Sequence, residues 1–199
     1  MNNKQSDYSN EEVVIDVSVT SFMMTVATFF TGFLISSYDS FSNSVRIPIF
    51  FLIVSTLSFL FTNIIFANAS GEIRTGNRSG ANKHAITGNI ISEFLGIYLL
   101  VTSLPLAINA ITEDIFLRDA VFIISIVALV AYSMSPFSII KRYLGTGYFR
   151  LLYSVAFAIL WASCFLTQKG DSVAYVCVSV ALISYLILTT IILLSRNKD

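Results

Sequence analysis

Long runs of apolar residues, separated by short polar stretches, follow one another along almost the whole chain. Each run approaches the roughly 20 residues that a helix needs to cross about 30 Å of hydrocarbon. The six runs are 17–37, 47–68, 86–110, 120–140, 148–166 and 172–194. The stretches between them hold the turn-forming residues and most of the charges. The pattern therefore predicts an all-α integral membrane protein, a bundle of about six transmembrane helices with short loops.

The two ends of the chain are polar. Residues 1–16 are net acidic and lack the basic segment and short apolar core of a cleavable signal peptide, so the first run is expected to remain as an anchor. The expected organisation is a cytoplasmic tail over 1–16, a transmembrane domain over 17–194 and a second cytoplasmic tail over 195–199.

Composition supports the membrane assignment. The chain is 55% hydrophobic and 12% charged, whereas soluble domains carry roughly 25% charged residues. The formal net charge of zero gives no general attraction to nucleic acid. The expected partners are the lipid bilayer and either a second copy of the chain or another membrane protein.

The distribution of lysine and arginine predicts the orientation, because short cytoplasmic loops retain basic residues. With six spans, one side of the membrane collects nine of the twelve basic residues and the other side collects three. The nine are Lys4, Arg74, Arg78, Lys83, Lys141, Arg142, Arg150, Arg196 and Lys198, and the three are Arg46, Arg118 and Lys169. Both termini are therefore expected on the cytoplasmic side of a cell membrane.

Glu93 is the acidic side chain that lies inside an apolar run. An ionised group in hydrocarbon is costly, so it needs partners, water or a nearby interface. One interpretation is a proton or ion site, with Asn89 and Ser92 on or beside the same helix face. The other is an interfacial carboxylate that reaches water or the basic residues of the preceding loop. The sequence leaves both interpretations open.

That preceding loop is the glycine-rich stretch 69–85, which carries Arg74, Arg78 and Lys83. The three cations are candidates for binding anionic lipid headgroups. A solvated connector that follows the positive-inside rule is the alternative. The stretch lacks the Gly-Lys-Ser/Thr ending of a phosphate-binding loop, because Asn77 and Arg78 follow Gly76.

No arrangement of residues indicates catalysis, a metal site or a cofactor. The chain has a single histidine, His84, and its two cysteines, Cys164 and Cys177, lie inside apolar runs. The sequence therefore argues against an enzyme. The function that it favours is a small channel or transporter whose third helix carries a carboxylate that responds to protons or cations. The alternative is a non-catalytic membrane accessory, immunity or defence protein, or scaffold subunit.

Two further expectations concern helix packing. Pro105 removes a backbone donor inside the third run, which predicts a kink there. Gly32 and Gly96 are expected at helix–helix contacts, because small residues allow the backbones to approach closely.

Overall fold

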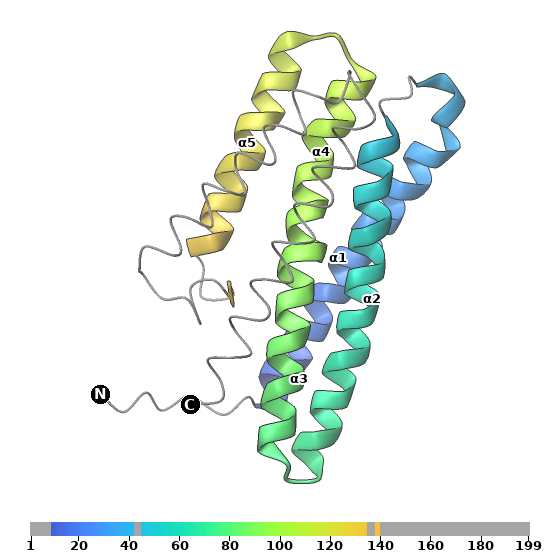
Figure 1. Cartoon of the computed structure of the whole chain (residues 1–199). Coiled ribbons are helices and arrows are strands. Elements are labelled where there is room, and N and C mark those ends of the chain that lie inside the picture. Colours follow the sequence, from blue (N-terminus) through green and yellow to red (C-terminus); the bar gives the residue numbers. More distant parts are fainter. Residues whose placement is uncertain (1–8, 42–44, 135–137, 140–199) are drawn as a thin grey trace.

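The computed structural model describes residues 9–41, 45–134 and 138–139, and every regular element in this part of the chain is helical (Figure 1). The elements are α1 (Asn10–Ser36), a short 3-10 helix η1 (Tyr38–Ser40), α2 (Arg46–Arg74), α3 (Arg78–Ile91), a π-helical segment η3 (Ser92–Ile97), α4 (Tyr98–Ile111) and α5 (Ile115–Met134). The all-α prediction is confirmed for these residues. The predicted runs 148–166 and 172–194 lie outside them, so the count of six spans stays a prediction.

Three helices are long and apolar enough to cross a membrane. They are α1, α2 and the uninterrupted helix Arg78–Ile111, which is 34 residues long and is formed by α3, η3 and α4 together. The helix continues through Pro105. The fourth predicted run corresponds to α5.

Successive helices run in opposite directions. The turn between α2 and α3 lies at the bottom of Figure 1, whereas the connections that precede α2 and α5 lie at the top. Arg74 and Arg78 are therefore at the opposite end of the bundle from Arg46 and Arg118. This separation agrees with the charge pattern of the sequence.

The outer surface of the helices is apolar. Phe29 on α1, Phe61 on α2 and Phe116 on α5 are 69%, 56% and 81% exposed, whereas the polar side chains of Ser55 and Glu93 are buried. A water-soluble domain rarely exposes an apolar surface of this extent. Lipid is the environment in which such a surface is stable.

α1 and α2 contact each other through polar side chains as well as apolar ones. The Asn63 amide of α2 donates to the Ser21 hydroxyl at 3.1 Å, and its side-chain oxygen contacts the Thr20 hydroxyl. The Ser70 hydroxyl bonds to Asn10 at 3.0 Å near the end of the pair. Most other hydroxyls of α1 instead donate to carbonyl groups of their own helix, namely those of Ser18, Thr25, Thr28 and Thr31. Only some of the hydroxyl groups of α1 therefore join it to α2.

The expected loop over 69–85 is wrong, because the helices occupy all of this stretch except a tight turn over 75–77. Gly76 has a positive φ of 79°, which a glycine adopts at little cost. The amide of Gly76 bonds to the Ile73 carbonyl at 3.1 Å, and the amide of Asn77 bonds to the Glu72 carbonyl at 2.9 Å. These two bonds form a Schellman motif that ends α2. The Asn77 side chain then accepts the Gly80 amide and starts α3.

The expectation for the two glycines is correct for Gly96 and wrong for Gly32. A Cβ atom at Gly96 would lie 2.5 Å from a ring atom of Phe59 on α2, whereas one at Gly32 would meet nothing within 4 Å. The buried residues of α1 are Val13, Thr20, Ala27 and Leu34, which recur at every seventh position. Gly32 lies away from this stripe and is exposed.

Candidate functional site

The candidate site lies where the helix Arg78–Ile111 changes from α to π geometry. Residues Ser92–Ile97 form a π-helical segment, and Glu93 is its second residue. A π-helical turn is rare, and it occurs frequently at functional sites. The local geometry therefore sets the segment around Glu93 apart from the helices on either side.

The register between α2 and this helix explains why the π-helical segment is needed. Two phenylalanines of α2, Phe59 and Phe66, are seven residues apart and pack on Gly96 and Gly88, which are eight residues apart. About seven residues complete two turns of an α-helix, so an eighth residue would rotate one glycine away from α2. The wider hydrogen-bond spacing of a π-helix absorbs the additional residue and keeps both glycines on the same face.

Two hydroxyls of α2 hold this register. Ser55 donates to the carbonyl oxygen of Gly96 at 2.8 Å, and Thr62 donates to that of Gly88 at 3.3 Å. The four α2 side chains in these contacts are all buried. One face of the π-helical segment is therefore fixed against α2, while Glu93 bonds to residues that follow α5 and to Tyr98 of its own helix.

Glu93 is 1% exposed, and three donors among the described residues reach its carboxylate. Its Oε1 accepts the Ser138 hydroxyl at 2.8 Å and the Tyr98 hydroxyl at 3.2 Å. Its Oε2 accepts the backbone N–H of Ile139 at 2.5 Å. The carboxylate thus joins the middle of one long helix to the chain that follows α5.

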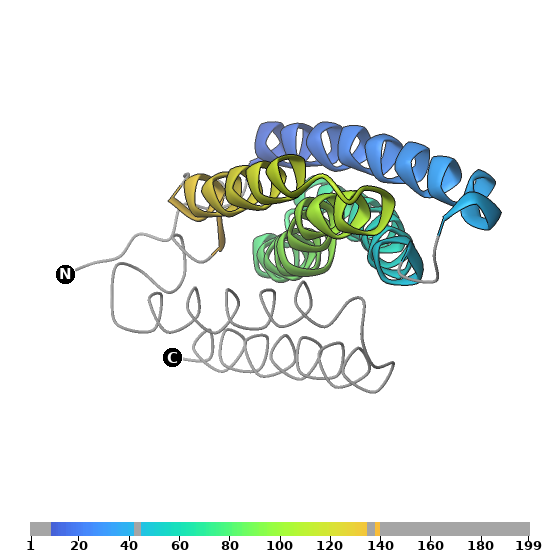
Figure 2. The same cartoon turned by 90° about the horizontal axis from the view of Figure 1, so that it is seen from above.

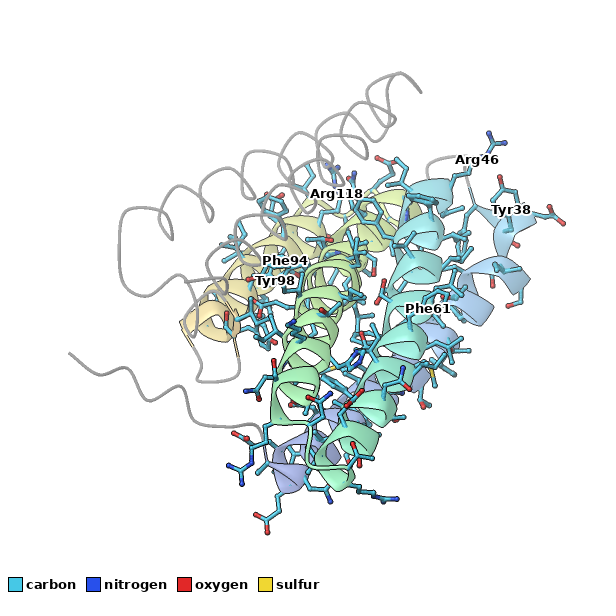
Figure 3. The ribbon with its side chains drawn as sticks, turned by 60° about the horizontal axis from the view of Figure 1, so that its bottom comes forward. Tyr38, Arg46, Phe61, Phe94, Tyr98 and Arg118 are labelled. Atoms are coloured by element: carbon cyan, nitrogen blue, oxygen red, sulfur yellow. The ribbon has the colours of Figure 1, made fainter. Side chains whose placement is uncertain are left out.

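Aromatic rings pack on one another next to this carboxylate. The ring of Tyr98 packs edge to face against Phe94, with centroids 5.6 Å apart, and against Tyr132 of α5 at 6.2 Å. Figure 3 shows Phe94 and Tyr98 on the side of their helix that faces α5. Phe94 and Tyr98 are both buried, so this aromatic group lies inside the bundle next to the carboxylate to which Tyr98 donates.

The alternative interpretation, in which Glu93 reaches the interface, does not fit this geometry. Lys83 and Arg78 precede Glu93 by about 15 Å and 22 Å along the helix axis, at 1.5 Å per residue. Both are exposed at the end of the helix pair, as is Arg74. Glu93 is instead enclosed by side chains, as a proton or ion site inside the bundle requires. Its role as such a site stays a prediction.

The other predicted site residues lie in different surroundings. Ser92 is buried next to Glu93, and Asn89 is half-buried one helical turn before it. The residues that donate to Glu93, Tyr98 and Ser138 among them, were not indicated by the sequence. Tyr98 follows Glu93 by five residues, which is the spacing of a π-helical hydrogen bond. In an α-helix the side chains that contact each other are three or four residues apart, so α-helical periodicity does not pair Tyr98 with Glu93.

The basic residues proposed for lipid headgroups form a separate group. Arg74, Arg78 and Lys83 are exposed around the α2–α3 turn. Glu72 also lies at this turn, and its carboxylate accepts the side-chain amide of Asn77 at 2.7 Å. Exposure is what binding of lipid headgroups requires, and that binding stays a prediction.

Metal binding has no support from the described residues, which contain no group of three histidine, cysteine or acidic side chains placed to share an ion. Comparison of the chain with protein-family models, with curated proteins and with solved structures finds no match. The site itself is therefore the basis for inferring a function.

Proposed function

We propose that this protein is a small membrane transporter or channel in which Glu93 takes up and releases a proton. The observation that carries the proposal is a carboxylate enclosed within a helix bundle, on a π-helical segment, with hydroxyl groups on one of its oxygens. Ionisable side chains inside transmembrane segments are expensive, and they commonly mark proton or ion pathways.

The chemistry of the three donors favours a proton over a metal cation. Oε2 is held by the Ile139 amide, a donor that cannot become an acceptor and that repels a cation. Oε1 is held by the hydroxyls of Ser138 and Tyr98, which can accept as well as donate. A proton on Oε1 can therefore be accommodated by rotation of these hydroxyls, without movement of the backbone.

Proton flux into liposomes tests this proposal. The full-length protein is reconstituted with a pH-sensitive dye inside the vesicles, and a membrane potential drives proton entry. We expect uptake above that of empty liposomes for the wild type, and uptake at the level of empty liposomes for Glu93→Gln. Glu113→Gln, which changes an exposed carboxylate before α5, is the matched control and should retain the flux of the wild type. Wild-type flux equal to that of empty liposomes contradicts the proposal.

A non-catalytic accessory or scaffold subunit is the second candidate, and one observation favours it. The three donors to Glu93 come from two segments that are far apart in sequence, so the carboxylate could serve only to join them. A wild type without proton flux that co-purifies with a stoichiometric membrane partner would support this candidate. Both candidates place the chain in a cell membrane with its two termini on the cytoplasmic side.

A further inference from the structure

Tyr98 is joined to Glu93 twice, once through the main chain and once through the side chain. Its backbone N–H donates to the carbonyl oxygen of Glu93, which closes the π-helical segment, and its hydroxyl donates to the Glu93 carboxylate at 3.2 Å. In an α-helix, two residues that are five apart point in directions about 140° apart, because each residue turns the helix by about 100°. The bond from the phenol to the carboxylate therefore depends on the π-helical geometry.

Ser55 of α2 holds this geometry from a different side of the helix. Figure 2 shows α2 and α5 on different sides of α4. The side chain of Ser55 is fully buried, and its hydroxyl donates at 2.8 Å to the carbonyl oxygen of Gly96, two residues before Tyr98. One turn further along α2, the ring of Phe59 lies so close to Gly96 that an added Cβ would be 2.5 Å from it. Ser55 and Phe59 therefore fix the rotation of the helix just before Tyr98.

Burial alone does not direct a serine of α2 toward the neighbouring helix. Ser58 is also buried, yet its hydroxyl donates at 2.7 Å to the Val54 carbonyl of its own helix. The hydroxyl of Thr62 does cross between the helices, but its acceptor is Gly88, which precedes the π-helical segment. Ser55 thus bonds to the π-helical segment itself, and Ser58 is a matched serine that does not.

We propose that Ser55 is a positioning residue for Glu93, because its bond to Gly96 keeps the register in which the Tyr98 hydroxyl reaches the carboxylate. This inference rests on the proposed function of Glu93. Loss of the Ser55 hydroxyl allows the segment to turn toward α-helical geometry, which carries the phenol away from Glu93. One of the two hydroxyls that accommodate a proton on Oε1 is then lost. Ser55 thereby acts through Tyr98 and not through a bond of its own to the carboxylate.

Infrared spectroscopy of the full-length protein in liposomes tests this inference. The carboxyl band of protonated Glu93 is assigned by its loss in Glu93→Gln. A carboxyl group with fewer hydrogen bonds absorbs at a higher frequency, so Tyr98→Phe should shift this band upward. We expect Ser55→Ala to shift the band in the same direction. Ser58→Ala is the matched control and should leave the band where it is in the wild type.

Two further variants separate a positioning role from a general loss of structure. With the phenol hydroxyl already absent, Ser55→Ala should add no further shift, so the double variant should match Tyr98→Phe alone. Ser55→Cys keeps a weak donor of similar size, and it should shift the band less than Ser55→Ala does. Shifts of Ser55→Ala and Tyr98→Phe that add in the double variant overturn the inference.

The remaining outcomes distinguish the role of Ser55 from transport. An unshifted band in Ser55→Ala overturns the inference, as do equal shifts in Ser55→Ala and Ser58→Ala or the absence of a Glu93 carboxyl band at any pH. The expected shifts, together with wild-type liposomes that carry no proton flux, support the role of Ser55 and contradict the transport proposal.

Discussion

At the scale of single residues, the sequence indicated Glu93 itself, and the surroundings of Glu93 show why its partners were missed. An acidic residue inside an apolar run is visible without any structure. Its donors Ser138 and Ile139 lie 45 and 46 residues further along the chain, where no local pattern relates them to it. The start of α1 at Asn10 was missed for another reason, because it was placed at the first apolar run. The capping box of Ser9 and Glu12, a signature readable in the sequence, marks the earlier start.

The three donors to Glu93 lead to a prediction about stability. Glu93→Ala leaves the hydroxyls of Ser138 and Tyr98 and the Ile139 amide without their acceptor, so it should destabilise the fold by about 2–5 kcal/mol. Glu93→Gln should stay within about 1 kcal/mol of the wild type, because its carbonyl can accept the amide while its NH₂ donates to the hydroxyls. Thermal unfolding in detergent measures both. Equal losses for the two variants would show that the charge itself stabilises the fold.

At the scale of elements, helix existence could be predicted from the apolar runs, whereas helix ends and registers could not. A helix that projects beyond the hydrocarbon can contain many polar residues and glycines, as the stretch 69–85 does. A search for apolar runs then assigns such a stretch to a loop. Gly76 followed by Asn77 was the available signal, because glycine ends helices and asparagine starts them. The π-helical segment had no such signal. It follows from the mismatch between the spacing of two phenylalanines on α2 and that of two glycines on the next helix.

The contact of Gly96 with Phe59 gives the prediction at this scale. Gly96→Ala places a methyl group 2.5 Å from a ring atom of Phe59, so it should lower the stability of the protein by about 1–3 kcal/mol through overpacking. Gly32→Ala is the matched control, because nothing lies within 4 Å of the added Cβ. It should be neutral or stabilise α1 by up to about 1 kcal/mol through helix propensity.

Thermal unfolding of the two alanine variants checks this expectation. Adding Phe59→Leu to Gly96→Ala should recover part of the loss, since the smaller side chain leaves room for the new methyl group. A Gly96→Ala protein as stable as the Gly32→Ala protein would contradict the proposed register.

At the scale of the whole molecule, α2 and the helix Arg78–Ile111 are both longer than the hydrocarbon layer is thick. The helix Arg78–Ile111 has 34 residues and measures about 51 Å, against about 30 Å of hydrocarbon. The polar turn at 75–77 should therefore stand well outside the bilayer, on the side that the basic residues assign to the cytoplasm.

Accessibility of single cysteines tests this orientation. In a background without Cys164 and Cys177, cysteines at Asn77, Gly145 and Lys198 should react only with a reagent that enters the cell. Cysteines at Asn43 and Lys169 should react with an impermeant one. Labelling of position 77 by the impermeant reagent would reverse the orientation, and a split between positions 77 and 198 would exclude an even number of spans.

The bonds between Glu93 and the chain after α5 have a consequence for biosynthesis. A ribosome completes the helix that carries Glu93 before it makes Ser138, which follows 45 residues later. During that interval the carboxylate has Tyr98 as a donor but lacks the Ser138 and Ile139 donors, and a charge at the centre of a bilayer costs about 3 kcal/mol on insertion scales. We therefore expect this helix to be less stably inserted until the later segments arrive. Nascent chains released before residue 138 should be recognised by quality-control proteases, which makes the order of synthesis part of how this fold is reached.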